Sequence, residues 1–189
     1  QYPVAIAAVL RAGYVVVNVN PLYTPRELEH QLKDSGAKAM LIVENFAATL
    51  QQVLVKVPVK HVITTQIGDM LPAPRRWLIN FIIKKVRKMV PDWQIDGTVT
   101  LNSALARGAA LSFTPVPVAR EDIAFLQYTG GTTGVSKGAM LTHRNILANL
   151  EQTGMWISVS FKEGEEIVIA PLPMYHIFCL TSTLSFMTW

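Results

Sequence analysis

Length, composition and charge narrow the class of protein before any motif is considered. The chain has 189 residues, of which 50% are hydrophobic and 16% charged, and its mean hydropathy is +0.30. The charged share lies below the ~25% typical of globular domains, so apolar material is ample for a buried core and there is little sign of disorder. The one cysteine, Cys179, cannot form an internal disulfide, which fits a reducing compartment such as the cytoplasm.

The net charge of +4 is concentrated in one segment. No acidic residue lies between Asp69 and Asp92, and without the cations of this interval the rest of the chain is net negative. The cations are Arg75, Arg76, Lys84, Lys85, Arg87 and Lys88. The basic character is therefore a local property of the chain.

The chain opens at Gln1 within an apolar helical pattern, without a signal-peptide pattern, and stops at Trp189 within another. We expect the chain to be a piece of a longer polypeptide, with neither end a natural terminus. The stretch 167–189 carries no charged residue, but prolines and hydroxyl residues interrupt it. It therefore favours a strand, a turn and a buried helix over a membrane span, which needs ~20 apolar residues.

Helix and strand patterns alternate over the first third of the chain. The predicted elements are a helix over 3–12, a strand over 14–19, a helix from Pro25 to Ser35, a strand over 38–43, a helix over 46–57 and a strand over 61–65. Thr24 and Glu27 have the capping-box spacing at the start of the second helix, and Gly36 ends it. This alternation predicts an α/β fold with mostly parallel sheets and flanking helices.

The alternation then lapses and later returns. The expected elements are a loop over 68–74, a helix over 75–90, an irregular stretch over 91–118 with a short helix near 103–107, a strand over 123–128, a glycine-rich loop, a helix from about Thr142 and a strand over 167–170.

The most informative stretch follows the strand that ends at Tyr128. Glycines, hydroxyl residues and one lysine crowd into ten positions, which are Thr129, Gly130, Gly131, Thr132, Thr133, Gly134, Val135, Ser136, Lys137 and Gly138. Glycine permits positive φ and close approach of backbone N–H groups to an anion, and a lysine adds a point charge for phosphate. The spacing matches neither G-x-x-x-x-G-K-[ST] nor G-x-G-x-x-G. The pattern favours a nucleotide triphosphate site over a plain flexible turn.

The stretch Tyr128 to Asn145, YTGGTTGVSKGAMLTHRN, resembles the signature loop of the adenylate-forming superfamily, which includes acyl-CoA synthetases, luciferases and the adenylation domains of peptide synthetases. A second stretch, 171–178 or PLPMYHIF, resembles the next motif of that family, beside the acyl and adenylate pocket. The start of the chain, 12–24, resembles a structural segment of the family. The sequence as a whole is most similar to bacterial long-chain fatty-acid–CoA ligases.

The resemblance implies that 1–189 is an incomplete N-terminal AMP-binding domain of an enzyme that converts a long-chain fatty acid to an acyl-adenylate and then to acyl-CoA. ATP, Mg²⁺ and coenzyme A are the implied cofactors. The phosphate-binding residues carried over are Thr129, Gly130, Gly131, Thr132, Thr133, Gly134, Lys137 and Gly138, with Thr129 also beside the metal. Tyr175 and His176 are carried over as pocket residues. No catalytic residue is assigned, and we expect this piece alone to be inactive.

Two other functions remain open at this stage. One is adenylation of an amino or aryl acid, because most of the acyl pocket would lie downstream. The other is a non-enzymatic, membrane-associated module in which the glycine loop is a plain turn. Nucleotide binding would exclude the second function.

The helix expected over 75–90 is basic and amphipathic. On a helical wheel the apolar face holds Leu78, Ile79, Ile82, Ile83, Val86, Met89 and Val90, and the polar face holds Arg76, Asn80, Lys84, Arg87 and Lys88, with Trp77 and Phe81 beside it. This composition suits peripheral association with the anionic inner face of a membrane, and equally an ordinary surface helix with a solvated basic face. No motif supports nucleic-acid binding.

Overall fold

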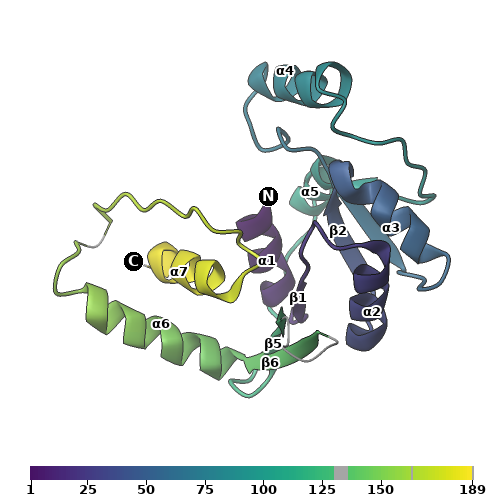
Figure 1. The fold of residues 1–189 in the computed structure, drawn as a ribbon. Coiled ribbons are helices and arrows are strands. Elements are labelled where there is room, and N and C mark those ends of the chain that lie inside the picture. The colour runs from purple at the N-terminus through teal and green to yellow at the C-terminus, as the bar shows by residue number, and fades with distance from the viewer. Residues whose placement is uncertain (130–135, 163, 189) are drawn as a thin grey trace. The chain divides into compact units, whose positions relative to one another are not determined.

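The computed structural model describes residues 1–129, 136–162 and 164–188, and its ribbon is drawn in Figure 1. These residues form two compact units. Unit 1 consists mainly of residues 21–114, and unit 2 mainly of residues 6–20 and 115–189. Each unit has its own sheet, so each is described by itself.

Unit 1 is built on a parallel sheet of three strands in the order β2-β3-β4. The strands are β2 (Ala39–Val43), β3 (His61–Thr65) and β4 (Val99–Thr100). Helices η1 (Glu44–Phe46), α3 (Ala47–Leu54) and α5 (Leu101–Ala109) connect or follow them, and α2 (Pro25–Ser35) precedes them. The alternation of strand and helix thus gives parallel pairing, as the sequence predicts.

Helix α2 starts and ends as its sequence predicts. The Thr24 hydroxyl accepts a hydrogen bond from the Glu27 backbone N–H, and the Glu27 carboxylate accepts one from the Thr24 backbone N–H at 2.8 Å. These bonds lower the pKa of Glu27, because both the backbone N–H and the hydroxyl of Thr24 favour the charged carboxylate. Gly36 ends the helix with φ +62°, and buried Leu28 and Leu32 pack its inner face.

The basic segment forms a shorter helix than expected. Helix α4 spans Arg75–Phe81 and continues as a wider π-helical turn, η2, over Ile82–Val86. The Met89 N–H donates to the Ile83 carbonyl at 3.0 Å, and Lys88 closes the segment with φ +49°. The predicted boundary at residue 90 is therefore wrong by four residues.

Unit 2 is built on a mixed sheet in the order β1-β5-β6. Strand β1 (Val16–Asn18) runs parallel to β5 (Ile123–Thr129), and β6 (Lys137–Thr142) runs antiparallel to β5. The helices of this unit are α1 (Tyr2–Arg11), α6 (His143–Ile157) and α7 (Ile177–Thr188). Their common core is the buried cluster of Ile6, Ala124, Phe125 and Leu180.

Two differences from the expected elements have a clear physical reason. Strand β6 is absent from the prediction, because glycine and lysine are weak strand formers and only pairing with β5 makes this stretch a strand. The strand predicted over 167–170 is wrong. These residues have no strand partner, and Ile167 and Ile169 are 94% and 83% exposed, so apolar character alone does not make them a strand.

The predicted helix in the last part of the chain is confirmed as α7, which contains the buried Leu180 and Cys179. No helix among the described residues has both the length and the apolar content needed to cross a bilayer.

The capping box of α2 gives a local test of this fold in the complete gene product. Replacing Thr24 with Ala removes the acceptor for the Glu27 N–H and is expected to cost about 1 kcal/mol. Hydrogen exchange of the first-turn amides should then accelerate by about fivefold.

Thr24→Ser keeps the hydroxyl and should keep the protection. In the parent, lowering the pH through the depressed pKa of Glu27 should weaken the cap, because stability tied to a lowered carboxyl pKa is present at higher pH and lost on protonation. Unchanged exchange in Thr24→Ala would contradict the assigned cap.

Candidate functional site

The predicted phosphate loop joins the two strands of a β-hairpin. Thr129, the last residue of β5, pairs with Lys137, the first residue of β6. The Ser136 hydroxyl donates a hydrogen bond to the Thr129 carbonyl at 2.9 Å, so both ends of the connection are tied together. The predicted loop residues Gly130, Gly131, Thr132, Thr133 and Gly134 lie outside the described residues.

The two residues that flank this connection differ from the buried strand behind them. Thr129 and Lys137 are both exposed, whereas Tyr128 is buried. The structure therefore brings together a hydroxyl-bearing and a cationic residue at the solvent end of the hairpin. Such a pair is suited to an anionic ligand, since the hydroxyl donates a hydrogen bond and the ammonium supplies a point charge.

Gly138 has a packing role beside this pair. It lies opposite Tyr128, and a Cβ at this position would meet the tyrosine ring at 2.9 and 3.0 Å. A larger residue would displace the buried ring that supports the end of β5. The glycine is thus explained by the approach of Tyr128, in addition to the phosphate-binding role that the resemblance implies.

A chain of buried side-chain amides ties β5 to the second predicted motif. The Asn18 Nδ2 of β1 donates to the Gln127 Oε1 at 2.9 Å. The Gln127 Nε2 in turn donates to the Tyr175 carbonyl oxygen at 2.8 Å. Gln127 precedes Thr129 by two residues, about 7 Å along a strand. The stretch 171–178 is therefore held close to the end of the strand that leads into the glycine loop.

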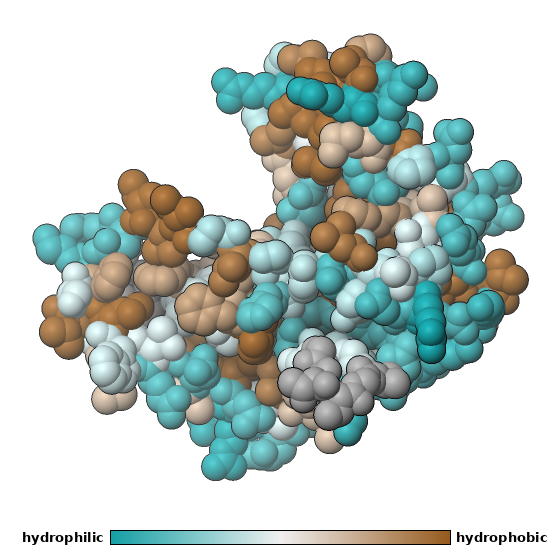
Figure 2. All heavy atoms as spheres, in the orientation of Figure 1, coloured by the Kyte–Doolittle hydropathy of each residue, from teal (hydrophilic) through white to brown (hydrophobic). Residues whose placement is uncertain are grey.

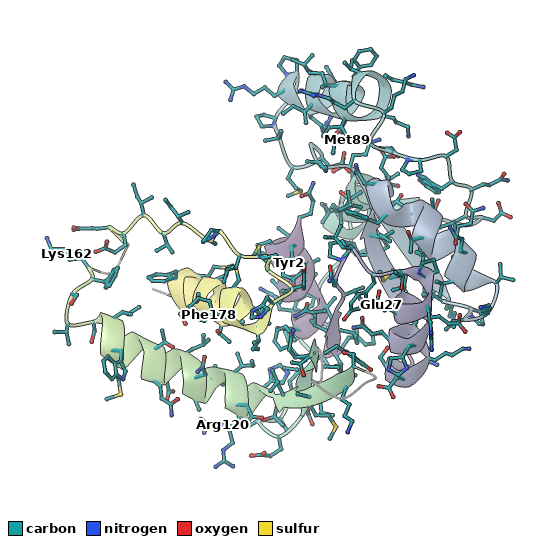
Figure 3. All side chains as sticks on the ribbon, viewed as in Figure 1. Tyr2, Glu27, Met89, Arg120, Lys162 and Phe178 are labelled. Carbon is teal, nitrogen blue, oxygen red and sulfur yellow. The ribbon has the colours of Figure 1, made fainter. Side chains whose placement is uncertain are left out.

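The other end of this amide chain is Tyr2, on α1, which is labelled in Figure 3. The Tyr2 hydroxyl donates to the Asn18 Oδ1. Burial raises the pKa of the Tyr2 hydroxyl, and the nearby Cys179 thiol adds to the effect. The phenol therefore keeps its proton, and the donor-to-acceptor direction along Tyr2, Asn18, Gln127 and the Tyr175 carbonyl is fixed.

His176 directly precedes α7 and stands two residues before Phe178, which is labelled in Figure 3. Its Nδ1 accepts a hydrogen bond from the Phe178 N–H at 3.3 Å, and its carbonyl accepts from the Leu180 N–H at 2.9 Å. The ring is exposed and the Tyr175 side chain is half-buried, so both are available for a ligand.

The end of the first motif, residues 141–145, starts helix α6. The Thr142 hydroxyl accepts a hydrogen bond from the Asn145 N–H at 3.2 Å, and the Asn145 Oδ1 accepts from the Thr142 N–H at 3.0 Å. The motif thus contains a helix N-cap as well as a loop. The helix start predicted at about Thr142 is confirmed.

Three residues that position this region were not among the predicted site residues. They are Tyr2, Asn18 and Gln127. For Asn18 and Gln127 the available signal was an amide side chain within an otherwise largely apolar strand. These strands are VVN and IAFLQYT. A buried amide needs partners, so each such residue predicts a hydrogen-bond network, although not which partners it has.

The metal prediction involves a single described residue. Among the described residues, no three or more His, Cys, Asp or Glu side chains gather into a possible metal centre. The exposed Thr129 hydroxyl is an oxygen donor of the kind that Mg²⁺ accepts. Magnesium commonly keeps several waters and binds substrate phosphates with few protein ligands, so this limited set of donors is compatible with a nucleotide-borne ion.

Comparison with solved structures defines the class of fold. The chain is similar to a luciferase from Phrixothrix hirtus, with a TM-score of 0.68, 21% identity, and coverage of 98% of this chain and 32% of the luciferase. It is also similar to a long-chain-fatty-acid–CoA ligase from Archaeoglobus fulgidus, with a TM-score of 0.65, 27% identity, and coverage of 97% and 31%. The fold is that of the N-terminal domain of adenylate-forming enzymes.

The family follows from the sequence comparison. The family model described as "AMP-binding enzyme" matches residues 1–189, and the chain belongs to this family. It is 54% identical over 181 residues to a long-chain-fatty-acid–CoA ligase of Salmonella typhimurium, which covers 96% of this chain and 32% of that protein. The chain therefore spans about a third of the length of such relatives.

The Gln127 amide offers a test of how the site is held. Replacing Gln127 with Ala leaves the Asn18 donor and the Tyr175 carbonyl without this partner, at a cost of about 1–3 kcal/mol. In the complete gene product, hydrogen exchange over 171–178 should accelerate and the melting temperature should fall.

A matched control is Gln52→Ala, because Gln52 is exposed on α3. It should change neither measurement. Equal exchange over 171–178 in Gln127→Ala and the parent would contradict the proposed anchoring of this stretch.

Proposed function

We propose that the complete gene product is an ATP-dependent long-chain fatty-acid–CoA ligase. The observation that carries this proposal is the 54% identity to relatives of that name over 96% of the chain. The motif residues on the β5–β6 hairpin support it, because an exposed hydroxyl and an exposed lysine flank the glycine-rich connection. The chain covers about a third of those relatives, so the proposal concerns the whole polypeptide.

The proposed reaction has two steps. A carboxylate oxygen of the fatty acid attacks the α-phosphorus of ATP, the bond to the bridging oxygen breaks, and pyrophosphate leaves with the bonding electrons. The coenzyme A sulfur, having lost its proton, then attacks the acyl carbon, and AMP leaves with the electrons of the acyl–oxygen bond. The first step produces the acyl-adenylate and the second the thioester.

In this proposal the hairpin binds the departing pyrophosphate portion of ATP. Lys137 and the Thr129 hydroxyl would contact phosphate oxygens, together with the backbone of residues 130–134 and Gly138. Charge grows on the leaving group during the first step, so a fixed cation and fixed donors stabilise the transition state more than the ground state. Bound Mg²⁺ would supply further positive charge for the phosphates, with Thr129 as the proposed ligand among the described residues.

The stretch 171–178 would form one wall of the acyl and adenylate pocket. Tyr175 is half-buried and His176 exposed, and the Gln127 amide holds the backbone between them near the hairpin. We assign both residues to substrate binding. Proton transfer by His176 is not part of the proposal.

The proposal also includes a location for the enzyme. Long-chain fatty acids partition into lipid, so a cytoplasmic ligase that associates with the inner face of the membrane has direct access to its substrate. The basic segment 75–90, which contains α4 and η2, is the part of the chain suited to that association.

The decisive assay measures pyrophosphate release by the complete gene product with ATP and Mg²⁺. We expect release that depends on fatty acids of long chain, and acyl-CoA only when coenzyme A is present. Release with amino or aryl acids instead would keep the family and favour the alternative substrate class. No release with any carboxylate would refute the proposed activity.

Lys137 provides a test of the nucleotide site within that assay. Lys137→Ala should lower kcat/KM for ATP roughly ten- to hundredfold, because a charge-assisted contact to the phosphates is lost. Lys60→Ala is the matched control, since Lys60 is an exposed lysine on unit 1. Equal kcat/KM for ATP in the parent and both variants would remove Lys137 from the proposed site.

A further inference from the structure

The outer face of helix α4 is apolar and aromatic. Trp77, Leu78 and Phe81 are 63%, 59% and 58% exposed, although they are among the largest apolar side chains in the segment. Figure 2 shows hydrophobic and hydrophilic side chains side by side over this helix, at the top of the view. Val86 and Met89 continue the exposed apolar series beyond the helix.

The inner face of the same segment is held largely by polar contacts. Asn80 accepts a hydrogen bond from the Gly68 N–H at 2.8 Å and donates one to the Asp69 carboxylate at 3.2 Å. One turn further on, the Lys84 ammonium lies 3.1 Å from the Glu44 carboxylate. Part of the polar face predicted on the helical wheel is therefore turned toward the rest of unit 1, and the aromatic residues beside it are exposed.

The contacts made by Asn80 and Lys84 on the inner face, here called the polar brace, include one buried carboxylate. Glu44 is buried, and its carboxylate accepts from the Gln66 side chain at 2.8 Å as well as from Lys84. The Asn45 side chain donates to the Met89 carbonyl at 3.0 Å, which ties the end of the segment to η1 within unit 1. The helix is thus fixed in orientation before it meets any partner.

Several cations lie in the same segment as the exposed apolar residues. Within the described part of the chain, no ion pair to an acidic side chain is found for Arg75, Lys85, Arg87 or Lys88. The Arg76 guanidinium lies 5.8 Å from the centre of the Trp77 ring. Exposed aromatic residues next to cations that lack acidic partners are the composition of helices that lie in the interface of an anionic bilayer.

We infer that residues 75–89 form a preformed docking surface for an anionic phospholipid bilayer. Trp77, Leu78 and Phe81 enter the boundary between headgroups and acyl chains, while Lys85 and Arg87 bind lipid phosphates. The inference deepens the proposed peripheral location and rests on that part of the proposed function, but not on the ligase chemistry. The polar brace by Asn80 and Lys84 keeps the apolar face outward, so no folding step accompanies binding.

The charge pattern favours lipid over other occupants of this face. No acidic residue lies between Asp69 and Asp92 to pair the cations of this segment, so the occupant of this face has to supply the negative charge. A lipid surface supplies apolar depth and a plane of phosphates together, and each cation near such a surface adds to the affinity. Nucleic acid would supply the charge but not the apolar layer.

The test is sedimentation of the complete gene product with vesicles. One set contains phosphatidylcholine alone, and the other contains about one-third phosphatidylglycerol. We expect binding to the second set and little to the first. The double variant Lys85→Gln and Arg87→Gln should lower the partition coefficient roughly thirtyfold, and Trp77→Ser with Phe81→Ser roughly tenfold or more.

Matched controls come from exposed residues elsewhere on unit 1. Lys60→Gln removes a cation, and Val55→Ser removes an apolar side chain that is 87% exposed. Both should bind vesicles as the parent does. Pyrophosphate release with a soluble, shorter fatty acid and no vesicles should be unchanged in all variants that fold, which separates failure of docking from failure of the proposed ligase activity.

The depth of insertion is tested with brominated lipids. Bromine on the upper acyl chain should quench part of the tryptophan fluorescence of the parent. Trp77→Phe keeps an aromatic side chain at the same position, so it should still sediment with anionic vesicles while losing that quenching. Retained quenching in Trp77→Phe would show that another tryptophan makes the contact and would overturn the assigned face.

Two further outcomes would overturn the inference. The first is equal sedimentation of the parent and the helix variants with anionic vesicles. The second is the absence of vesicle binding together with a lower melting temperature of the Trp77→Ser, Phe81→Ser variant, which would show that the rest of the polypeptide covers this face.

Discussion

The Gln127 side chain is the contact on which the arrangement of the site depends. It lies in the central strand of its sheet, where it accepts from Asn18 on one side and donates to the Tyr175 carbonyl on the other. Because an unpaired buried amide is costly, the strand and the stretch 171–178 are stable together in this arrangement. The motifs 128–145 and 171–178, which 25 residues separate in the sequence, are thereby joined at the base of the hairpin.

The strand ends that flank the predicted phosphate loop are held by ordered neighbours. Its two ends are paired across the strands at Thr129 and Lys137, and Phe125 and Tyr128 anchor the same strand in the core. Helix α6 begins directly after β6 with its own capping box, which leaves little slack between loop and helix. In the proposed site, Thr129 and Lys137 would therefore meet a ligand with a small entropic cost, because both belong to paired strand ends.

Local chemistry explains which parts of the fold were predictable. The bounds of α2 follow from Thr24 and Gly36, because caps act through neighbours in the sequence. Strand β3 was predicted over its observed range, since its β-branched residues are bounded on both sides by breakers of strand structure. The glycine loop was assigned to phosphate binding from its composition and its place after a strand, and this assignment stays a prediction because residues 130–134 lie outside the described part of the chain.

Tertiary pairing explains the parts that were not predictable. The stretch 137–142 becomes a strand only because β5 lies beside it, whereas the more apolar stretch 167–170 has no strand to pair with. Tyr2 and Asn18 join the site through side-chain hydrogen bonds over a long sequence separation, for which the local sequence carries no partner information. The helical wheel of α4 likewise separated its faces but could not show which face the polar brace would turn inward.

The cations in the segment that contains α4 also affect how copies of the protein would associate. An exposed patch with Trp77 and Phe81 would ordinarily favour self-association. Two such patches brought face to face would also bring Lys85 and Arg87 of one copy against those of the other, and like charges repel at that range. The charges that attract this face to an anionic bilayer in our proposal therefore also oppose self-association through it. Trp77 and Phe81 can then remain exposed to water without causing aggregation.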